Sequence, residues 1–256
     1  MKRRLAIALL AVLVLVSASD ARRRRNRTQP TPPPPQGVVQ IPCDPSIDQI
    51  EDCPDRGCSN GRAFDPLLNE RKNIRPSSDT PIDKDFSYLH TRPNPGDDDF
   101  EEGGSREALT SLGEGQMIRI VGYAVRVSRG SSESCNCQLT RMRDKDNHIV
   151  LIDPNDGSPS LADEPKSQTA EFTPRVRLDH PNLKWSKLNA LIQAASRQAL
   201  KVRVTGLQMF DSFHFFHNAL PRHNNWEIHP VFGLEYCPRG KHCEAGSDAN
   251  WVDIEQ

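Results

Sequence analysis

The sequence predicts a mainly β protein in which residues 116–236 form a small five-stranded barrel with one helix between strands 3 and 4. A disordered N-terminal region is expected to precede this barrel. Two segments rich in β-branched residues predict its curved strands, because each changes the parity of its polar positions near a glycine. One amphipathic helical pattern lies between the strand segments, and an Arg- and Pro-rich stretch lies ahead of them.

The first predicted strand covers residues 116–128. Its polar residue Arg119 has an odd number, whereas Arg126 and Ser128 have even numbers, and Gly122 lies between them. One extra residue exchanges the two faces of a strand, so this change predicts a bulge or kink at the glycine.

The fourth predicted strand covers residues 200–210 and has the same feature. Polar and apolar residues alternate as far as Thr205, and after Gly206 the polar position moves to Gln208. Glycine inside a strand is typical of a bend or a close backbone approach. Two strands that bend at glycines favour a closed barrel over a flat sheet.

A helix is predicted ahead of this fourth strand. Leu188, Leu191, Ile192 and Ala195 recur at the i, i+3, i+4, i+7 spacing of a buried helical face, with Ser186 as the expected N-cap.

Further strands are predicted at 148–152, 168–174 and 226–236, with a shorter one at 134–140. Because Pro230 has no backbone N–H to donate, the middle of the last strand is expected at a sheet edge or in a bulge. The order strand–strand–strand–helix–strand–strand is that of an oligonucleotide/oligosaccharide-binding (OB) barrel. An immunoglobulin-like sandwich is the alternative, for which about seven strands and no helix are expected.

The N-terminus predicts export. Residues 1–21 have a basic start, a twelve-residue apolar run at 5–16 and small residues after it, the pattern of a secretory signal. A permanent anchor is the weaker alternative, because twelve residues are too few to span a hydrocarbon core of about 30 Å. The protein is therefore expected in the periplasm or outside the cell, without a stable membrane span.

Three other segments flank the barrel. Residues 22–42 are expected to be a disordered Arg/Pro-rich tether, since they hold little to bury. Residues 43–115, acidic and cysteine-containing, are expected to be poorly structured apart from one short helix at 65–73. Residues 237–256 are expected to form a C-terminal tail with a cysteine loop.

Seven cysteines fit an oxidising compartment. Cys53 and Cys58 are close enough to staple a loop, as are Cys237 and Cys243, but spacing alone does not fix the pairing. The odd number leaves a thiol free or paired between chains. Two interpretations stay open for the C-N-C motif at 135–137: a disulfide to another cysteine, or a metal chelate with His148.

Composition excludes several classes of protein. The chain has 33 Lys and Arg against 34 Asp and Glu, with 36% hydrophobic residues and 21 prolines. It is therefore not a collagen, a coiled coil, a polytopic membrane protein or a globally basic nucleic-acid binder. The sequence also lacks the G-x-S-x-G and Walker-type motifs that would indicate a serine hydrolase or a nucleotide hydrolase.

A polar cluster is predicted near the C-terminal strands, where five of the eight histidines lie between His180 and His229. Asp211, His214, Glu227 and His229 could bind Zn²⁺ or another divalent ion, because imidazole and carboxylate are its ordinary ligands. Acid–base catalysis is a second interpretation. Structural anchoring of a loop is favoured over both, because no H-E-x-x-H spacing supports a zinc hydrolase.

Three stretches of this region resemble a group of uncharacterised exported bacterial proteins: Val202–Gly206, Asp211–His214 and the W-E-I-H-P motif that begins at Trp226. The resemblance spans residues 116–236, and residues 53–73 are similar to a segment of bacterial hypothetical proteins. The resemblance implies membership of that group and export, but it indicates no reaction and no catalytic residue.

The function favoured by the sequence is an exported binding or structural module, not an enzyme, with an oligosaccharide or a nucleic acid as ligand. Its expected contacts are four cations and one stacking aromatic: Arg119, Arg126, Lys201, Arg203 and Tyr123. The alternative is a metal-dependent hydrolase, similar to a phosphodiesterase or nuclease, that uses the polar cluster. A scaffold bound to an envelope protein is a third hypothesis. No cofactor is expected other than such a metal ion.

Overall fold

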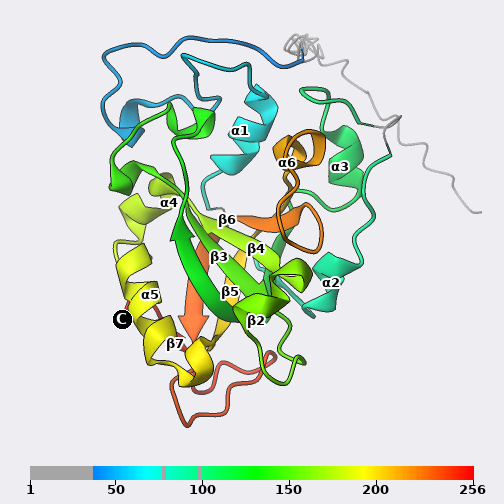
Figure 1. Cartoon of the computed structure of the whole chain (residues 1–256), viewed down its shortest axis with the longest axis vertical. Coiled ribbons are helices and arrows are strands. Elements are labelled where there is room, and N and C mark those ends of the chain that lie inside the picture. The colour runs from blue at the N-terminus through cyan, green and yellow to red at the C-terminus, as the bar shows by residue number, and fades with distance from the viewer. Residues whose placement is uncertain (1–36, 77–78, 97–99) are drawn as a thin grey trace, which may run out of the picture. The chain divides into compact units, whose positions relative to one another are not determined.

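The computed structural model describes residues 37–76, 79–96 and 100–256, which belong to one folded unit. The expected signal peptide at 1–21 and the first part of the expected tether, residues 22–36, lie outside the described residues. At the centre of this unit is a β-barrel (Figure 1).

Five strands close the barrel. They are β2 (Met117–Arg129), β3 (Asn147–Ile152), β4 (Gln168–Phe172), β5 (Leu200–Phe210) and β6 (Trp226–Tyr236). The strands follow the order β2-β3-β4-β6-β5, and β5 pairs back with β2. Only the β4–β6 pair of the barrel is parallel. The predicted five-stranded OB-like barrel is confirmed.

The predicted helix between the third and fourth barrel strands is also confirmed. Two helices lie there, α4 (Pro174–Asp179) and α5 (Trp185–Ala194). Leu188 and Ile192 of α5 are buried in the main core, as the spacing predicts. The N-cap is Lys184, two residues before the expected Ser186, so the helix begins at Trp185. The Trp185 side chain donates from Nε1 to the carbonyl of Val127 at 3.0 Å.

Gly206 is the predicted kink of β5. The pairing of β5 with β6 shifts on both sides of this residue, so that one residue, Leu207, faces two residues of β6, His229 and Pro230. A Cβ at Gly206 would lie 2.4 Å from the Pro230 carbonyl oxygen. Only glycine allows this close approach, and the bulge expected at Pro230 lies opposite it.

The bulge in β2 lies at a different place from the prediction. Its pairing with β3 shifts between Ala124 and Arg126, whereas the pairing with β5 passes through Gly122 without a shift. Gly122 instead makes room for a ring, since a Cβ there would lie 3.0 Å from Cε2 of Phe86. A change of parity therefore locates a bulge in the strand but does not fix its residue.

Within 43–115, the described residues 43–76, 79–96 and 100–115 are folded against the barrel, contrary to the expectation of a poorly structured region. They contain α1 (Pro66–Lys72), α2 (Ser87–His90), α3 (Glu107–Ser111), the short strand β1 (Ile82–Lys84) and the 3-10 turn η1 (Ile50–Asp52). The helix expected at 65–73 is confirmed as α1, and Asp65 caps it by accepting from the backbone N–H of Leu67 at 2.8 Å. Strand β1 extends the sheet by parallel pairing with β2.

The disulfides differ from the simplest expectation. Cys53 does not pair with Cys58: the bonds are Cys43–Cys58 and Cys53–Cys137, while Cys237–Cys243 is confirmed. The seventh cysteine, Cys135, is a buried free thiol. Cys137 is bonded to Cys53, so for this cysteine the disulfide interpretation of the C-N-C motif is confirmed and the alternative chelate with His148 does not form. Three disulfides indicate an oxidising compartment.

The stretch 134–140, expected to be a short strand, begins with the 3-10 turn η2 (Ser134–Asn136). Short 3-10 turns also occur at η3 (Met142–Asp144), η4 (Leu161–Lys166) and η5 (Ser196–Gln198). The C-terminal tail adds β7 (Val252–Asp253) to β6. In the described ranges, no helix is both long and apolar enough to cross a membrane.

Candidate functional site

A row of polar side chains crosses three neighbouring strands on the outer face of the barrel. His148 of β3 pairs opposite Glu171 of β4, and the β4–β6 register places Glu171 next to His229. The residues that alternate with them along the strands are buried in the main core: Ile149, Ala170 and Ile228. Since successive side chains of a strand point to opposite faces, the row lies outside the barrel.

The N-terminal segment covers this row. Lys72 of α1 donates to Glu133 at 2.9 Å, and Asn73 donates to the backbone oxygen of Cys135, also at 2.9 Å. The β2–β3 connection therefore lies beneath α1, and the Cys53–Cys137 bond links it to the cap. We use "cap" for residues 43–76. The face expected to line a groove is buried as a result, with His229 fully inaccessible.

The four residues predicted as metal ligands belong to one network, which Arg222 divides. Nδ1 of His229 lies 3.1 Å from Glu227, whose other oxygen accepts from Arg222 at 2.6 Å. Arg222 also donates to Asp211 at 2.5 Å. The same Asp211 oxygen lies 2.5 Å from Nδ1 of His214. Because a guanidinium is always charged, a cation does not fit among these four residues.

Each imidazole in this network is held through Nδ1 by a carboxylate. For His229 the carboxylates are Glu227 at 3.1 Å and Glu171 at 3.2 Å, and for His214 the carboxylate is Asp211. Asp211 also caps α6 (Ser212–Phe216), where its side chain accepts from the backbone N–H of His214 at 3.3 Å. The interpretation of the cluster as a structural anchor therefore describes Asp211 and Glu227 well. Nε2 of each ring is left for another role.

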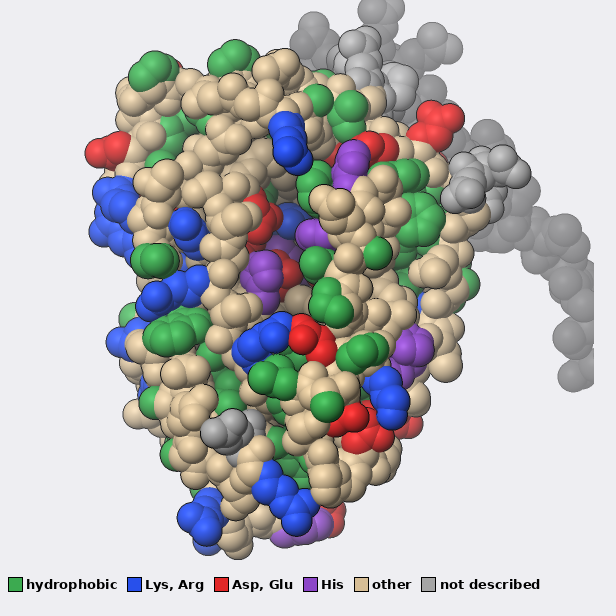
Figure 2. Space-filling view, in the orientation of Figure 1, with side chains coloured by type: hydrophobic (Ala, Val, Ile, Leu, Met, Phe, Trp, Pro, Cys, Tyr) green, Lys and Arg blue, Asp and Glu red, His purple; other side chains and the backbone are tan. Residues whose placement is uncertain are grey.

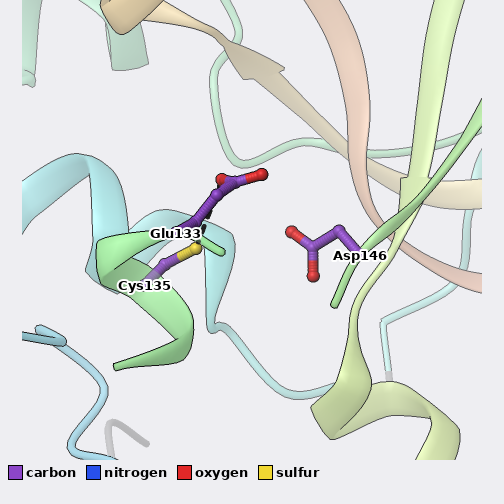
Figure 3. A group of neighbouring side chains, drawn as sticks. All are labelled: Glu133, Cys135 and Asp146. Carbon is purple, nitrogen blue, oxygen red and sulfur yellow. Dashed lines mark hydrogen bonds between the residues drawn. The ribbon is translucent and has the colours of Figure 1, made fainter. Parts of the chain in front are cut away.

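Two groups of potential metal ligands lie beside this network. In the first, atoms of Asp146, Glu171 and His229 lie within 4.8 Å of one another; in the second, Asp146 is joined by Glu133 and Cys135 within the same limit. Figure 3 shows the second group, with Asp146 facing the other two residues. Of the four predicted ligands, only His229 belongs to either group.

Three buried atoms in the first group have no hydrogen-bond partner among the described residues: Nε2 of His229, Oδ2 of Asp146 and Oε2 of Glu171. The first two lie 3.9 Å apart, and Oε2 of Glu171 lies 3.2 Å from Nδ1 of His229. Buried polar atoms are nearly always paired, so unpaired atoms gathered at one place indicate room for an ion or a water molecule.

Burial and neighbouring charges determine which side chains of the cluster carry protons when no ion is bound. Burial disfavours the imidazolium form of His229, but the carboxylates of Glu171 and Glu227 outweigh burial and raise the pKa of His229 to about 10. Burial acts against the charged form of Glu171 too, yet His148 and His229 hold the pKa of that carboxyl far below its usual range. Burial, together with the charge of Glu133, raises the pKa of Asp146. A cation bound at His229 must therefore displace its proton.

The cluster carries more negative than positive permanent charge. Its permanent cations are Lys72 and Arg222. Its carboxylates outnumber them and are Glu133, Asp146, Glu171, Asp211 and Glu227. Buried charges need compensation, so protons or a divalent ion must supply the remaining positive charge.

The residues expected to bind an oligomeric ligand lie on β2 and β5, away from this row. Their charges are already paired within the chain: Arg119 with Asp83, Arg126 with Glu164, and Arg203 with Glu235 and Asp248. Lys201 donates to the carbonyl of Cys243 at 2.7 Å, and Tyr123 is half-buried. Strand parity predicted the faces of these residues but not the acidic partners from distant segments.

The row occupies the place where OB barrels bind their ligands. Such barrels use the face of their second and third strands and the loops after their first and fourth strands. Here these are β3, β4, and the loops 130–146 and 211–225. The polar cluster draws on all four elements.

One side of the cluster is open to solvent. The side chains of His148, His214 and Glu133 are 29%, 26% and 21% exposed. Figure 2 shows a hollow in this view in which histidine, acidic and basic side chains gather. Solvent therefore reaches this edge of the cluster.

Sequence analysis missed Asp146, Glu171, Glu133 and Lys72. Asp146 and His148 are two residues apart at the start of a strand, and Thr169 and Glu171 occupy the polar positions of β4. This alternation was a usable signal for Glu171. No local pattern indicated that a helix 61 residues before Glu133 would bring Lys72 to the same place.

Comparison with known proteins gives no relative. No protein-family model, curated protein or solved structure matches the chain. The fold and the site define an OB-like barrel with a capped cluster of carboxylates and histidines, and the functional argument rests on that geometry.

Proposed function

We propose that this protein is an exported metal-dependent hydrolase whose ion is held by Asp146, Glu171 and His229. The observation that carries the proposal is the unpaired, fully buried Nε2 of His229, 3.9 Å from the unpaired Oδ2 of Asp146. Imidazole and carboxylate are ordinary ligands of Zn²⁺ and related ions. His148, whose Nε2 lies 3.4 Å from Glu171, is close enough to contribute a fourth ligand.

The surrounding residues support metal binding. Ligating histidines usually donate their other ring nitrogen to a carboxylate, which fixes the orientation of the ring. Glu227 has this position next to His229, and Arg222 in turn holds Glu227. Arg222 therefore separates the four predicted ligands, but through Glu227 it orients His229, the one that belongs to the proposed site.

The proposed reaction is hydrolysis of a phosphodiester. A bound divalent ion lowers the pKa of a coordinated water to about 7. Such a water would lose a proton to solvent, its oxygen would bond to phosphorus as the ester bond breaks, and the leaving alkoxide would take up a proton. We assign the proton to His214, because Asp211 holds its Nδ1 and its ring is partly exposed. Burial opposes the charged form, but Asp211 raises the pKa of His214.

Export is part of the same proposal. The three disulfides support an oxidising location. The basic and apolar N-terminal sequence supports delivery to the periplasm or the outside of the cell.

The test is metal content and turnover in protein purified without a metal-chelating tag. After incubation with Zn²⁺, Co²⁺ or Mn²⁺ and desalting, the wild type should retain metal and hydrolyse bis(p-nitrophenyl) phosphate. His229→Ala should lose both, whereas Arg126→Gln, whose ion pair with Glu164 is not part of the cluster, should keep both. Less than about a tenth of an equivalent of metal in the wild type would overturn the proposal, because a catalytic site should hold its ion.

A second function is favoured by the position of the cluster on the OB ligand face. If metal is retained but no phosphodiester is hydrolysed, the protein is better described as a metal-dependent binding module for an oligosaccharide or a nucleic acid. Binding of a labelled oligonucleotide would distinguish these ligands, since phosphate contacts weaken steeply with added salt.

A further inference from the structure

The free thiol of Cys135 lies inside the metal-binding region. Its side chain is buried, and its Sγ lies 3.5 Å from Oε2 of Glu133. Asn73 holds its backbone oxygen, and the neighbouring Cys137 is bonded to Cys53. The backbone on both sides of the thiol is therefore fixed, and the thiol is positioned towards the carboxylates.

Cys135 shares this position with two carboxylates. One ligand atom each from Glu133, Cys135 and Asp146 lies within 4.8 Å of the others. In Figure 3, Glu133 and Cys135 come from the η2 segment, and the Asp146 carboxylate faces them from the opposite side. Thiolate, carboxylate and carboxylate form an ordinary ligand set for Zn²⁺.

Asp146 has a free oxygen for such an ion. Its Oδ1 accepts from Asn136 at 3.0 Å, but its Oδ2 has no hydrogen-bond partner in the part of the chain that the structure describes. The residue is fully buried, so water outside the protein does not satisfy this oxygen. This unpaired carboxylate is an observation independent of the cysteine.

We propose that the site takes two thiophilic divalent ions, the second bound by Glu133, Cys135 and Asp146, with Asp146 bridging to the first. This inference rests on the proposed function, because the first ion is the one held by Asp146, Glu171 and His229. Asp146 is the residue common to both ligand groups. Carboxylate-bridged pairs of ions, about 3.5–4 Å apart, are established hydrolytic centres.

The thiol determines which metals fit. Sulfur ligands select Zn²⁺ and Co²⁺, whereas Mg²⁺, Ca²⁺ and Mn²⁺ prefer oxygen. The second ion is the weaker one, because the ammonium group of Lys72 lies 2.9 Å from Glu133 and opposes another cation. The two ions should therefore bind in order, the second giving the site its metal specificity.

The experiment is a Co²⁺ titration of the full chain, with the disulfides intact and without reductant or oxygen. Thiolate bound to Co²⁺ gives a charge-transfer band in the near ultraviolet. In the wild type this band should appear with the second equivalent. In Cys135→Ser the band and the second equivalent should be lost, while the first equivalent remains. Glu133→Gln keeps the thiol and should weaken the second equivalent by at least about tenfold.

Each outcome decides between the two proposals. One equivalent without the band, unchanged in Cys135→Ser, overturns the second ion and leaves the proposed function intact. A band that appears with a single equivalent overturns the two-ion centre and assigns Cys135 to the first ion. No binding of Co²⁺ at all overturns both proposals. Near-ultraviolet circular dichroism of the metal-free variants controls for folding, and Glu133→Gln provides the test if Cys135→Ser does not fold.

Discussion

Arg222 is the residue on which the polar network depends. Its two terminal nitrogens donate to Asp211 and Glu227, which in turn hold the two imidazoles of His214 and His229. A buried charge pair adds little net stability, but removal of one partner leaves the other uncompensated. The stability of the network and the orientation of its histidines are therefore coupled through one side chain.

Replacement of this side chain should be costly. Arg222→Met leaves Asp211 and Glu227 without their cation and should lower the free energy of unfolding by about 3–5 kcal/mol. The measurement is urea denaturation with the disulfides intact. The matched control, Arg126→Gln, removes a partly exposed ion pair with Glu164 and should change the free energy by about 0–1 kcal/mol. Equal effects of the two substitutions would contradict the role assigned to Arg222.

The protonation of His229 predicts a pH dependence of stability. In the metal-free protein its pKa is raised to about 10, from an ordinary value of 6.5. The folded state thus holds the proton more tightly, and this contribution is complete below pH 6.5 and lost as the pH rises towards 10. The free energy of unfolding should fall by a few kcal/mol over this window, since one pKa unit corresponds to about 1.4 kcal/mol.

The control for this pH dependence is His229→Gln, measured with a chelator present. The variant should lose most of the slope between pH 6.5 and 10, whatever its stability at neutral pH. If wild type and variant show parallel profiles, other groups are responsible and His229 is neutral in the folded protein.

Among the elements, the β5–β6 pair positions the site. The bulge opposite Leu207 contains His229, and Gly206 allows the two strands to approach. Bulges near functional sites commonly redirect a side chain. Here the bulged residue is the histidine whose Nε2 lies in the candidate metal site.

A side chain at Gly206 should therefore disturb the site as well as the barrel. Gly206→Ala places Cβ 2.4 Å from the Pro230 carbonyl oxygen and should cost about 1–3 kcal/mol, the range for overpacking. Binding of Zn²⁺, measured by calorimetry, should weaken in parallel. Gly233→Ala in the same strand pair is the control, because its Cβ would meet nothing closer than 3.8 Å. If both variants bind Zn²⁺ equally, Gly206 does not position His229.

The elements also show what sequence analysis can and cannot predict. Strand parity and helical spacing are local, and they predicted the barrel strands, the helix with Leu188 and Ile192, and the kink at Gly206. The cap was not predicted, because its few apolar residues become a core only against distant partners such as Cys137. His229 was a candidate ligand because histidines and acidic residues cluster near the C-terminal strands, whereas Glu171 joins it only through strand pairing and Asp146 only through the folded chain.

The described part of the chain is a barrel to which a second layer has been added. OB barrels usually leave the face of their second and third strands open to a ligand. In this protein the cap buries part of that face and leaves one edge of the cluster exposed. The cap thereby encloses most of the cluster, where charges interact more strongly than in water.

The attachment of the cap can be tested through its disulfide. Cys53 and Cys137 are 84 residues apart in sequence, and removing this bond with a double Cys→Ser substitution should cost about 2–5 kcal/mol and weaken metal binding. The Cys237–Cys243 bond closes a separation of only 6 residues, away from α1 (Figure 1). Its removal should leave metal binding unchanged. Equal loss of metal in both double variants would show that the cap does not complete the site.

The Cys53–Cys137 bond also sets an order of assembly. Until an oxidant forms it, the segment that carries Lys72 has no covalent link to the turn that carries Cys135. Under the proposed function, a chain in which this bond is reduced should therefore hold its metal less tightly than the oxidised chain. If the protein is exported as proposed, its metal site would be complete only after the chain meets an oxidant.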